Sequence, residues 1–171
     1  MEEKLREFFN TNFKDAVIKE DNFRGDISYY IKPESLYSIC ESLLSHTALD
    51  VKFLADITSL DWLNHAEEKD GRFEVIYNLY SISNAFRFFL KVRLDGDNPT
   101  IKSLVDLWDG ANWMEREVFD MMGINFEGHP NQTKILTADE LDGHPLRKDF
   151  PLTWEQPKFT WNQDDPPEVI K

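Results

Sequence analysis

The stretch "RFEVIYNLYSISNAFRFFLKVRL", residues 72–94, decides the fold because it carries the strongest strand signals in the chain. Two runs rich in aromatic and β-branched residues, 72–82 and 86–94, flank the short polar segment "SNA", and this pattern predicts a hairpin. Successive side chains of a strand point to opposite faces. In the second run the inward set is Phe86, Phe88, Leu90, Val92 and Leu94, and the outward set is Arg87, Phe89, Lys91 and Arg93. One face of the hairpin therefore belongs to a core, and the other is mostly polar.

Helical and strand patterns surround this hairpin. Apolar residues recur at helical spacing near the N-terminus and again after Pro33, which suits the first turn of a helix. The order of the elements does not repeat βαβ units, so it predicts an α+β fold, a two-layer domain with a mixed sheet packed on helices. The predicted helices cover residues 2–13, 33–46, 101–108 and 111–122, and the further predicted strands cover residues 15–23, 25–33 and 51–62.

Charge and cysteine content exclude several classes of function. The 171 residues include 32 acidic and 19 basic side chains, a net charge of −13, and DNA-binding proteins rely on Lys and Arg to neutralise phosphates. The single cysteine, Cys40, excludes an internal disulfide and cannot alone hold an iron–sulfur cluster or a structural zinc ion. Apolar runs fall short of the ~20 residues that span a bilayer, and the start lacks the apolar centre of a signal peptide. We therefore expect a soluble, cytoplasmic protein that does not bind nucleic acid.

The segment "ANWMEREVFDMMGINFEGHP", residues 111–130, combines acidic residues, an arginine, a histidine and a tryptophan, as an active site or an interface would. Gly110 and Gly123 stand where a helix begins and ends, and Arg116 and Asp120 have the i,i+4 spacing of an ion pair. An ordinary helix with one solvated charged face would explain this pattern. Trp113, however, shares its side of the helix with acidic residues, which indicates that something covers this side. The predicted core stripe consists of Ala111, Met114, Val118, Met121 and Met122.

The C-terminal part of the chain has a different character. Residues 123–171 are rich in proline and have no sustained periodicity, yet they contain many leucine, phenylalanine and tryptophan residues. A solvated linker is poor in such residues. We therefore expect a compact domain at residues 1–122 and an extended, partner-binding arm at residues 123–171.

A catalytic or metal site finds little support. His129 and His144 each lie in a "GHP" triplet near acidic residues, but their spacing from Glu115 and Glu117 matches no common ligand pattern. The glycines form neither a dinucleotide-binding nor a phosphate-binding loop, and a G-x-S-x-G elbow is missing. A free-standing metal-dependent hydrolase or oxidoreductase that uses these four residues stays open as an alternative.

The runs "EREVFDMMGINFEGHP" and "DGHPLRKDFPL" resemble the C subunit of respiratory complex I, the thirty-kilodalton subunit of NADH:quinone oxidoreductase. Upstream, "LADITSLDW" and "ANW" also look like this family, so the resemblance covers most of the chain. Two departures stand out. Residues 131–134, "NQTK", replace a stretch that is usually Asp-Leu-Arg-Arg-like, and Met122 replaces a common Phe. Lys134 then stands where an Arg is usual and loses any bidentate contact with a carboxylate.

The resemblance implies a non-catalytic structural subunit of the peripheral arm. Such subunits look like a compact domain whose C-terminal segment wraps the large quinone-site subunit (the D subunit) beside neighbouring iron–sulfur subunits. They carry no cofactor, and flavin mononucleotide and the iron–sulfur clusters belong to partner subunits. The complex transfers electrons from NADH to quinone, coupled to ion translocation. The chain itself is expected on the cytoplasmic side of the bacterial inner membrane, as a peripheral part of this membrane complex. Related subunits in membrane-bound hydrogenase-type complexes form a further alternative.

The interface implied by this resemblance combines apolar anchors and charged groups. Leu146, Phe150, Trp154 and Trp161 are expected to fill pockets of the partner. The basic residues are expected to meet carboxylates, and the acidic residues to pair locally or across the interface. The full predicted interface set is Glu115, Arg116, Glu117, Asp120, His129, Pro130, His144, Pro145, Leu146, Arg147, Lys148, Asp149, Phe150, Trp154 and Trp161.

Overall fold

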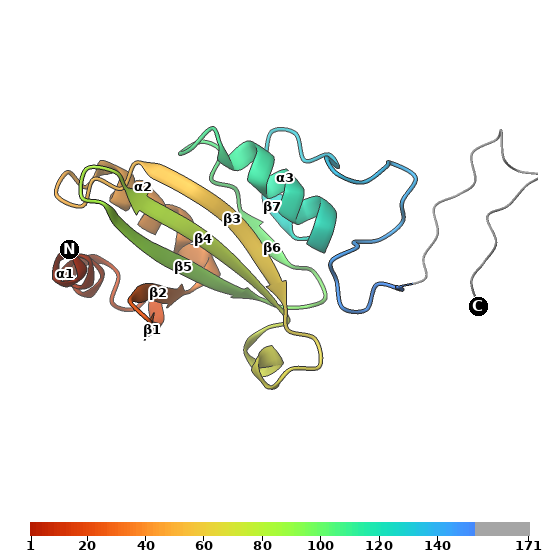
Figure 1. Cartoon of the computed structure of the whole chain (residues 1–171), viewed down its shortest axis with the longest axis horizontal. Coiled ribbons are helices and arrows are strands. Elements are labelled where there is room, and N and C mark those ends of the chain that lie inside the picture. The colour runs from red at the N-terminus through yellow and green to blue at the C-terminus, as the bar shows by residue number, and fades with distance from the viewer. Residues whose placement is uncertain (153–171) are drawn as a thin grey trace, which may run out of the picture.

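Five strands form the main sheet of this computed structural model, which describes residues 1–152 (Figure 1). Their order is β1–β2–β5–β4–β3. β2 and β5 run parallel, whereas the other neighbouring strands are antiparallel, so the sheet is mixed. The strands are β1 Val17–Phe23, β2 Asp26–Ile31, β3 Phe53–Asp61, β4 Phe73–Ser81 and β5 Phe86–Leu94. The predicted hairpin is the β4–β5 pair, and its alternation is confirmed, because Phe88, Leu90, Val92 and Leu94 are buried.

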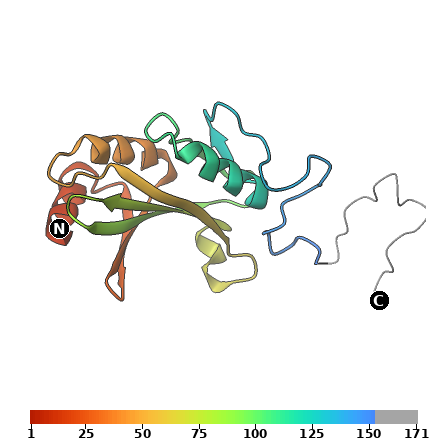
Figure 2. The same ribbon diagram turned by 45° about the horizontal axis from the view of Figure 1, so that its top comes forward.

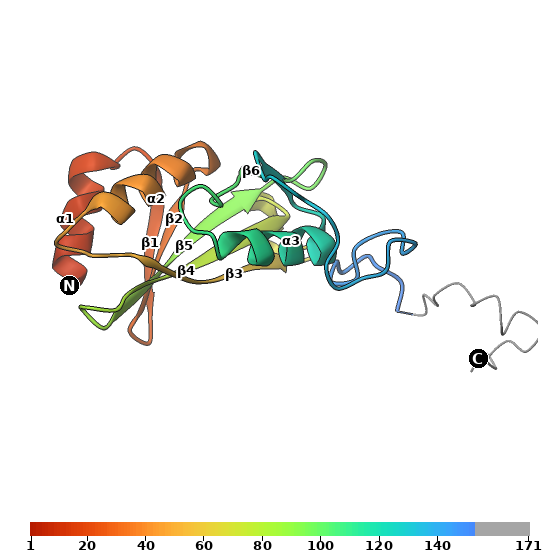
Figure 3. The same ribbon diagram turned by 90° about the horizontal axis from the view of Figure 1, so that it is seen from above.

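The helices pack on one side of this sheet. Figure 3 shows α1 and α2 over one end of the sheet and α3 alongside β3. In Figure 2, α2 and α3 lie above the sheet, and the loop that contains η2 hangs below it. The helical elements are α1 Glu2–Asn12, η1 Pro33–Ser35, α2 Leu36–Ser45, η2 Ala66–Asp70 and α3 Ala111–Met122. The predicted α+β fold with a mixed sheet packed on helices is confirmed.

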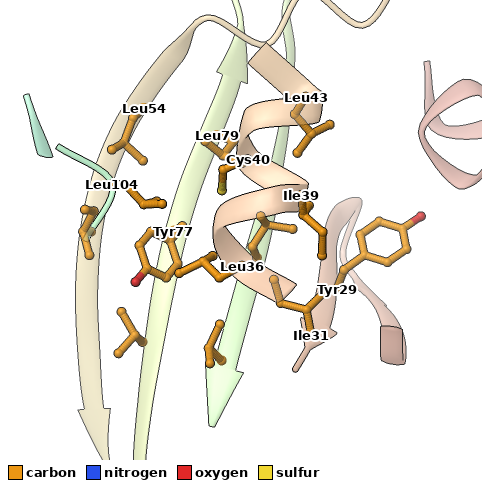
Figure 4. Packing of buried hydrophobic residues seen from close by; sticks show 14 of the residues in the cluster. Tyr29, Ile31, Leu36, Ile39, Cys40, Leu43, Leu54, Tyr77, Leu79 and Leu104 are labelled. Carbon is orange, nitrogen blue, oxygen red and sulfur yellow. The ribbon is translucent and has the colours of Figure 1, made fainter. Parts of the chain in front are cut away.

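The core lies between the helices and the inward face of the sheet. Leu36, Ile39, Cys40 and Leu43 of α2 point at the strands, where they meet residues such as Tyr77 and Leu79 of β4 (Figure 4). At the end near the N-terminus, the ring of Phe9 stacks on that of Tyr29, with 4.2 Å between centroids. Full burial of one such side chain contributes about 1.5–3 kcal/mol, so this layer holds the sheet and the helices together.

The predicted helix at residues 101–108 is wrong. Thr100–Lys102 form a short strand, β6, which pairs in parallel with β7, Asn125–Glu127. After β6 the chain makes only a single turn, because the N–H of Leu104 and the hydroxyl of Ser103 bind a side chain of α3. A local apolar pattern was thus overridden by pairing with a segment more than twenty positions later in the sequence.

The body of the protein continues past the predicted domain boundary at residue 122. Ile124 and Phe126 are buried and belong to the same core as the helices and strands. β7 then ties this segment to β6. The arm predicted at residues 123–171 therefore begins with a part that is integral to the fold. Trp154 and Trp161 lie outside the described residues.

Candidate partner interface

Helix α3 organises the region in which most of the predicted interface residues lie. Its inward stripe consists of Ala111, Glu115, Val118 and Met122, which are buried, whereas the predicted stripe members Met114 and Met121 are only half-buried. Gly123 ends the helix with φ +70°, a left-handed conformation that glycine adopts without strain. The opposite side carries Trp113, Glu117 and Asp120 at i, i+4 and i+7. Residues at this spacing share one side of a helix.

Glu115 points into the body rather than toward a partner. Its side chain has no exposed surface. Ser103 Oγ donates to Glu115 Oε2 at 2.6 Å, and the N–H of Leu104 donates to Oε1 at 2.7 Å. Burial raises the pKa of Glu115 to about 7, although both hydrogen bonds act in the opposite direction. Its prediction as a direct interface residue is therefore corrected: Glu115 joins the β6–α3 connection to the helix, and any role at an interface is indirect.

Replacing Glu115 should change the pH dependence of stability. The folded-state pKa of about 7 lies above the ordinary value of 4.5, so the folded chain binds this proton more tightly than the unfolded chain does. The free energy of unfolding should therefore fall by roughly 3 kcal/mol as pH rises from about 4.5 to about 7. Glu115→Gln cannot titrate and should lack this decline in urea denaturation at pH 5 and pH 8. Equal slopes in both proteins would contradict this account.

Asp120 is also internal, but it faces the outer side of α3. Its buried carboxylate accepts the backbone N–H groups of Ile135, Leu136 and Thr137 at 2.8–2.9 Å, and also the Thr137 hydroxyl. Burial alone would raise the pKa of Asp120, but these hydrogen bonds lower it to about 2. The carboxylate thus fixes residues 135–137 on the helix. This placement also corrects the prediction that Asp120 contacts a partner directly.

The predicted ion pair between Arg116 and Asp120 is wrong. Arg116 instead donates to the backbone oxygens of Thr133 and Lys134 and to the Thr133 hydroxyl at 3.0–3.2 Å. Its guanidinium lies over the ring of Trp113, 5.2 Å from the centroid. Helical spacing allowed the ion pair, but the loop at 133–137 supplies better-placed partners to both residues.

Lys134 closes the next part of the loop. Its ammonium group donates to the backbone oxygens of Ala138, Asp139 and Leu141. A compact ammonium group points its three donors in tetrahedral directions, whereas the donors of an arginine guanidinium lie in one plane. The lysine that stands at position 134 in place of the family's usual arginine therefore has a structural role, because it holds residues 138–141 of this loop.

The "GHPLRKD" residues hold the C-terminal segment against the end of α3. His144 Nδ1 donates to the backbone oxygen of Asp120 at 2.9 Å, and the N–H of Leu146 donates to that of Met121 at 3.0 Å. Arg147 Nε donates to the backbone oxygen of Met122 at 2.6 Å. These groups bind the last carbonyls of the helix, which have no partner within the helix itself. We call residues 144–149 and their contacts the latch.

The far end of the latch binds the body at the junction of β3 and β4. Lys148 donates its N–H to the carboxylate of Asp61 at 2.9 Å, and Asp149 forms an ion pair with Arg72 at 2.9 Å. Arg72 also binds Asp61 at 3.0 Å. Burial would raise the pKa of Asp61, but its bonds to Arg72 and to backbone N–H groups lower it to about 2. Sequence reasoning missed Asp61 and Arg72 because they lie more than seventy positions from the latch.

The other predicted residues show varied surroundings. His129 Nε2 donates to the backbone oxygen of Asn112 at 3.2 Å, and its Nδ1 accepts the N–H of Asn131. Phe150 is half-buried beside Gly143. The remaining side chains are exposed or half-exposed, namely Glu117, Pro130, Pro145 and Leu146. These exposed residues stay predictions as partner contacts.

The hydrogen bonds around α3 hold neighbouring segments of the chain in place, and they give little support to a catalytic or metal site. Within residues 1–152, no group of three or more His, Cys, Asp and Glu side chains is placed to hold a metal ion. None of the helices in the same part of the chain is both long and apolar enough to cross a membrane. The charged residues of the motif mostly bind backbone groups of the chain itself. Their common effect is to fold residues 128–150 over α3.

Comparisons with known proteins identify the family. A family model described as "Respiratory-chain NADH dehydrogenase, 30 Kd subunit" matches residues 29–156. The C subunit of NADH-quinone oxidoreductase from Roseiflexus sp. (strain RS-1) is 45% identical over 150 residues, covering 88% of this chain and 84% of that protein. NADH-quinone oxidoreductase subunit 5 of Thermus thermophilus is 41% identical over 138 residues, covering 78% of this chain and 65% of the relative.

Solved structures agree with this family. A trypsin-resistant fragment of Nqo5 superposes with a TM-score of 0.63 at 31% identity, covering 74% of this chain and 98% of the fragment. A chain of the membrane-bound sulfane sulfur reductase, an archaeal respiratory membrane complex, superposes with a TM-score of 0.72 at 21% identity, covering 88% and 85% of the two chains. At 21% identity, the likeness to the sulfane sulfur reductase chain shows a shared fold and nothing more. The resemblance seen in the sequence is therefore confirmed, and the chain belongs to the family of 30 kDa subunits of the respiratory-chain NADH dehydrogenase.

Proposed function

We propose that the chain is a non-catalytic structural and assembly subunit in the peripheral arm of NADH:quinone oxidoreductase. It docks on the large quinone-site subunit (the D subunit) beside neighbouring iron–sulfur subunits. Flavin mononucleotide and the iron–sulfur clusters belong to these partners, and the chain supports electron transfer from NADH to quinone by holding the partners in place. The chain lies on the cytoplasmic side of the bacterial inner membrane, as a peripheral part of this membrane complex.

One observation carries this proposal. The charged residues of the motif are used inside the chain, where Arg116, Asp120 and Arg147 bind backbone groups and fix two segments on α3. An active site needs polar groups that converge on a space for substrate. Here the polar groups converge on the chain itself, and large apolar side chains such as Trp113 and Leu146 point outward. This is the pattern of a surface built to be covered by another protein.

The alternatives receive less support. The names of the curated relatives favour complex I over a hydrogenase-type complex. The metal-dependent enzyme would need Glu115, Glu117, His129 and His144 to meet. Instead, Glu115 binds Ser103 inside the body, and His144 binds the helix backbone at the opposite end of α3 from His129 and Asn112.

Affinity purification tests the proposal. The tagged chain, recovered from its native membranes in mild detergent, should bring down the large quinone-site subunit and the flavoprotein subunit, identified by mass spectrometry. The eluate should oxidise NADH with quinone, and the chain purified alone should not. Recovery of hydrogenase subunits would instead show that the chain belongs to a membrane-bound hydrogenase-type complex. Elution of the chain by itself, with activity or tightly bound metal, would overturn the proposal.

A further inference from the structure

We infer that the outer side of α3, with the two segments packed on it, docks against an apolar patch of another subunit that is rimmed by lysine and arginine. This inference rests on the proposed function, because it specifies the chemistry of the partner at the same interface. Two features of the chain carry it: the apolar centre of this surface, and the unequal use of its acidic and basic side chains.

The apolar centre consists of Trp113, Leu136 and Leu146, which are 62%, 63% and 59% exposed. Trp113 projects from the outer side of α3. Leu136 lies over the same side, because its N–H binds the Asp120 carboxylate, and Leu146 is tied to the C-terminal end of the helix through Met121. Trp113 therefore lies near the start of the helix, and Leu136 and Leu146 are both anchored at its last turn. We call these three side chains the docking face.

The docking face is pre-organised. The guanidinium of Arg116 supports the ring of Trp113, and it is itself fixed by hydrogen bonds to Thr133 and Lys134. Leu136 is held by the bonds of Asp120. Tryptophan is enriched among residues that dominate binding, and an anchor that is already ordered loses less conformational entropy when it is covered. Scattered exposed apolar residues are common, but a supported group of three around one helix marks an interaction surface.

The basic side chains around the docking face already form hydrogen bonds within the chain. Arg116, Lys134 and Arg147 donate to backbone oxygens of the chain, and Lys148 Nζ donates to that of Leu63. Their charges remain, but their donors are directed inward. A partner therefore finds few outward hydrogen-bond donors among the side chains of this surface.

Acidic groups around the docking face remain available. Four exposed acids lie beside it, and in residues 1–152 none of their carboxylates forms an ion pair. One is on the outer side of α3, and the others lie in the loop between Leu136 and Leu146. They are Glu117, Asp139, Glu140 and Asp142. A complementary partner presents cations to these carboxylates.

Charge also argues against a second copy as the occupant. Two copies would bring the same acidic rim together, and like charges across an interface are unfavourable. The face of the sheet that the helices leave open does not favour a partner of one charge. Its groove, of about 310 Å³, is lined by Lys19, Lys91, Glu67 and Asp70, so it is mixed in sign. The docking face is therefore the surface with a defined partner chemistry.

The test uses the full-length tagged chain in its native membranes, with three kinds of variant. Trp113→Ala, Leu136→Ser and Leu146→Ser remove the apolar anchors, and Glu140→Gln with Asp142→Asn neutralises part of the rim. Ile82→Ser is the matched control, because Ile82 is 70% exposed on the turn between β4 and β5. A photoreactive residue in place of Leu136 identifies the partner residues that touch the face. Thermal melting of each purified chain checks that it folds.

The expected result has three parts. Each anchor variant melts like the wild type but retains on the order of 30-fold less of the partner subunits, the loss expected for a dominant contact. The rim variant retains about tenfold less of the partner subunits at low salt, and this difference disappears at high salt. The Ile82→Ser chain is retained like the wild type, and the crosslinked partner segment is rich in Lys and Arg.

Other results overturn the inference in distinguishable ways. Anchor variants retained like the wild type would show that another surface docks, while the proposed function stands. A crosslinked segment without basic residues, or a rim variant that is retained like the wild type at low salt, would remove the charge argument. Crosslinks between two copies of the chain would show that the docking face binds a second copy instead of another subunit. If the wild-type chain recovers no subunits at all, the proposed function itself fails.

Discussion

Asp120→Ala should destabilise the isolated chain by roughly 3–5 kcal/mol, because it removes the acceptor of four hydrogen bonds at once. The N–H groups of Ile135, Leu136 and Thr137 would lose the carboxylate that holds this loop on α3. The free energy of unfolding, measured by urea denaturation at pH 7, gives the loss. A total stability of only ~5–15 kcal/mol makes such a loss large.

Two control variants separate the possible causes. Asp120→Asn keeps an oxygen for the three backbone N–H groups and should lose less than half as much stability as Asp120→Ala. Glu117→Ala changes an exposed acid on the same side of the helix and should stay within about 0.5 kcal/mol of the wild type. Equal stability of Asp120→Ala and Glu117→Ala would contradict the anchoring role of Asp120.

Acid should weaken the same anchor. The folded-state pKa of Asp120 is about 2, below the ordinary 3.8, so its contribution to stability is present above pH 3.8 and is lost as pH falls through about 2. The advantage of the wild type over Asp120→Asn should therefore shrink over this interval.

Gly123→Ala should destabilise the chain by about 3 kcal/mol and release the latch. The backbone at Gly123 has φ +70°, and an added Cβ would collide with the His144 ring and the Arg147 guanidinium. To make room, both side chains would have to leave the last carbonyls of α3. Urea denaturation measures the loss of stability, and limited proteolysis after Arg147 and Lys148 reports the release.

Gly128→Ala is the matched control for this collision. Gly128 also has a positive φ, +85°, but no other atom of residues 1–152 lies within 4 Å of the position that a Cβ would take. Replacing it with alanine should therefore lower the free energy of unfolding by only about 1 kcal/mol, the strain of an alanine at a positive φ. Similar losses for the two variants would mean that the close packing at Gly123 contributes nothing.

Local patterns in the sequence predicted the elements of the body well. Alternation in β5 and helical spacing in α2 depend on neighbours within a few residues, and both elements appear where the patterns placed them. The predicted helix at 101–108 failed because a distant strand, β7, and the side chain of Glu115 determine that segment. Neither partner is visible in a short local apolar pattern.

The interface residues were harder to interpret because one motif performs two tasks. Residues such as Asp120 and Arg147 are charged and clustered, which from the sequence alone resembles a contact with a partner. The structure shows that their own backbone is the partner. Trp113 gave the more useful signal, since a tryptophan on an acidic helix side has no internal explanation. Leu136 could not be recognised, because its exposure depends on how the loop folds over Asp120.

The latch also has a consequence for the order in which the chain acquires its structure. The bond from Lys148 to Asp61 spans 87 positions, so we expect its loop to close after the more local contacts of β3 and α3 have formed. During synthesis the body can therefore fold before residues 144–149 leave the ribosome, and the latch is added last. In the finished protein the same segment can open without unfolding the core. Amide hydrogen exchange at residues 146–150 should then be faster than in β4 and β5, and it should slow once a neighbouring subunit is in place.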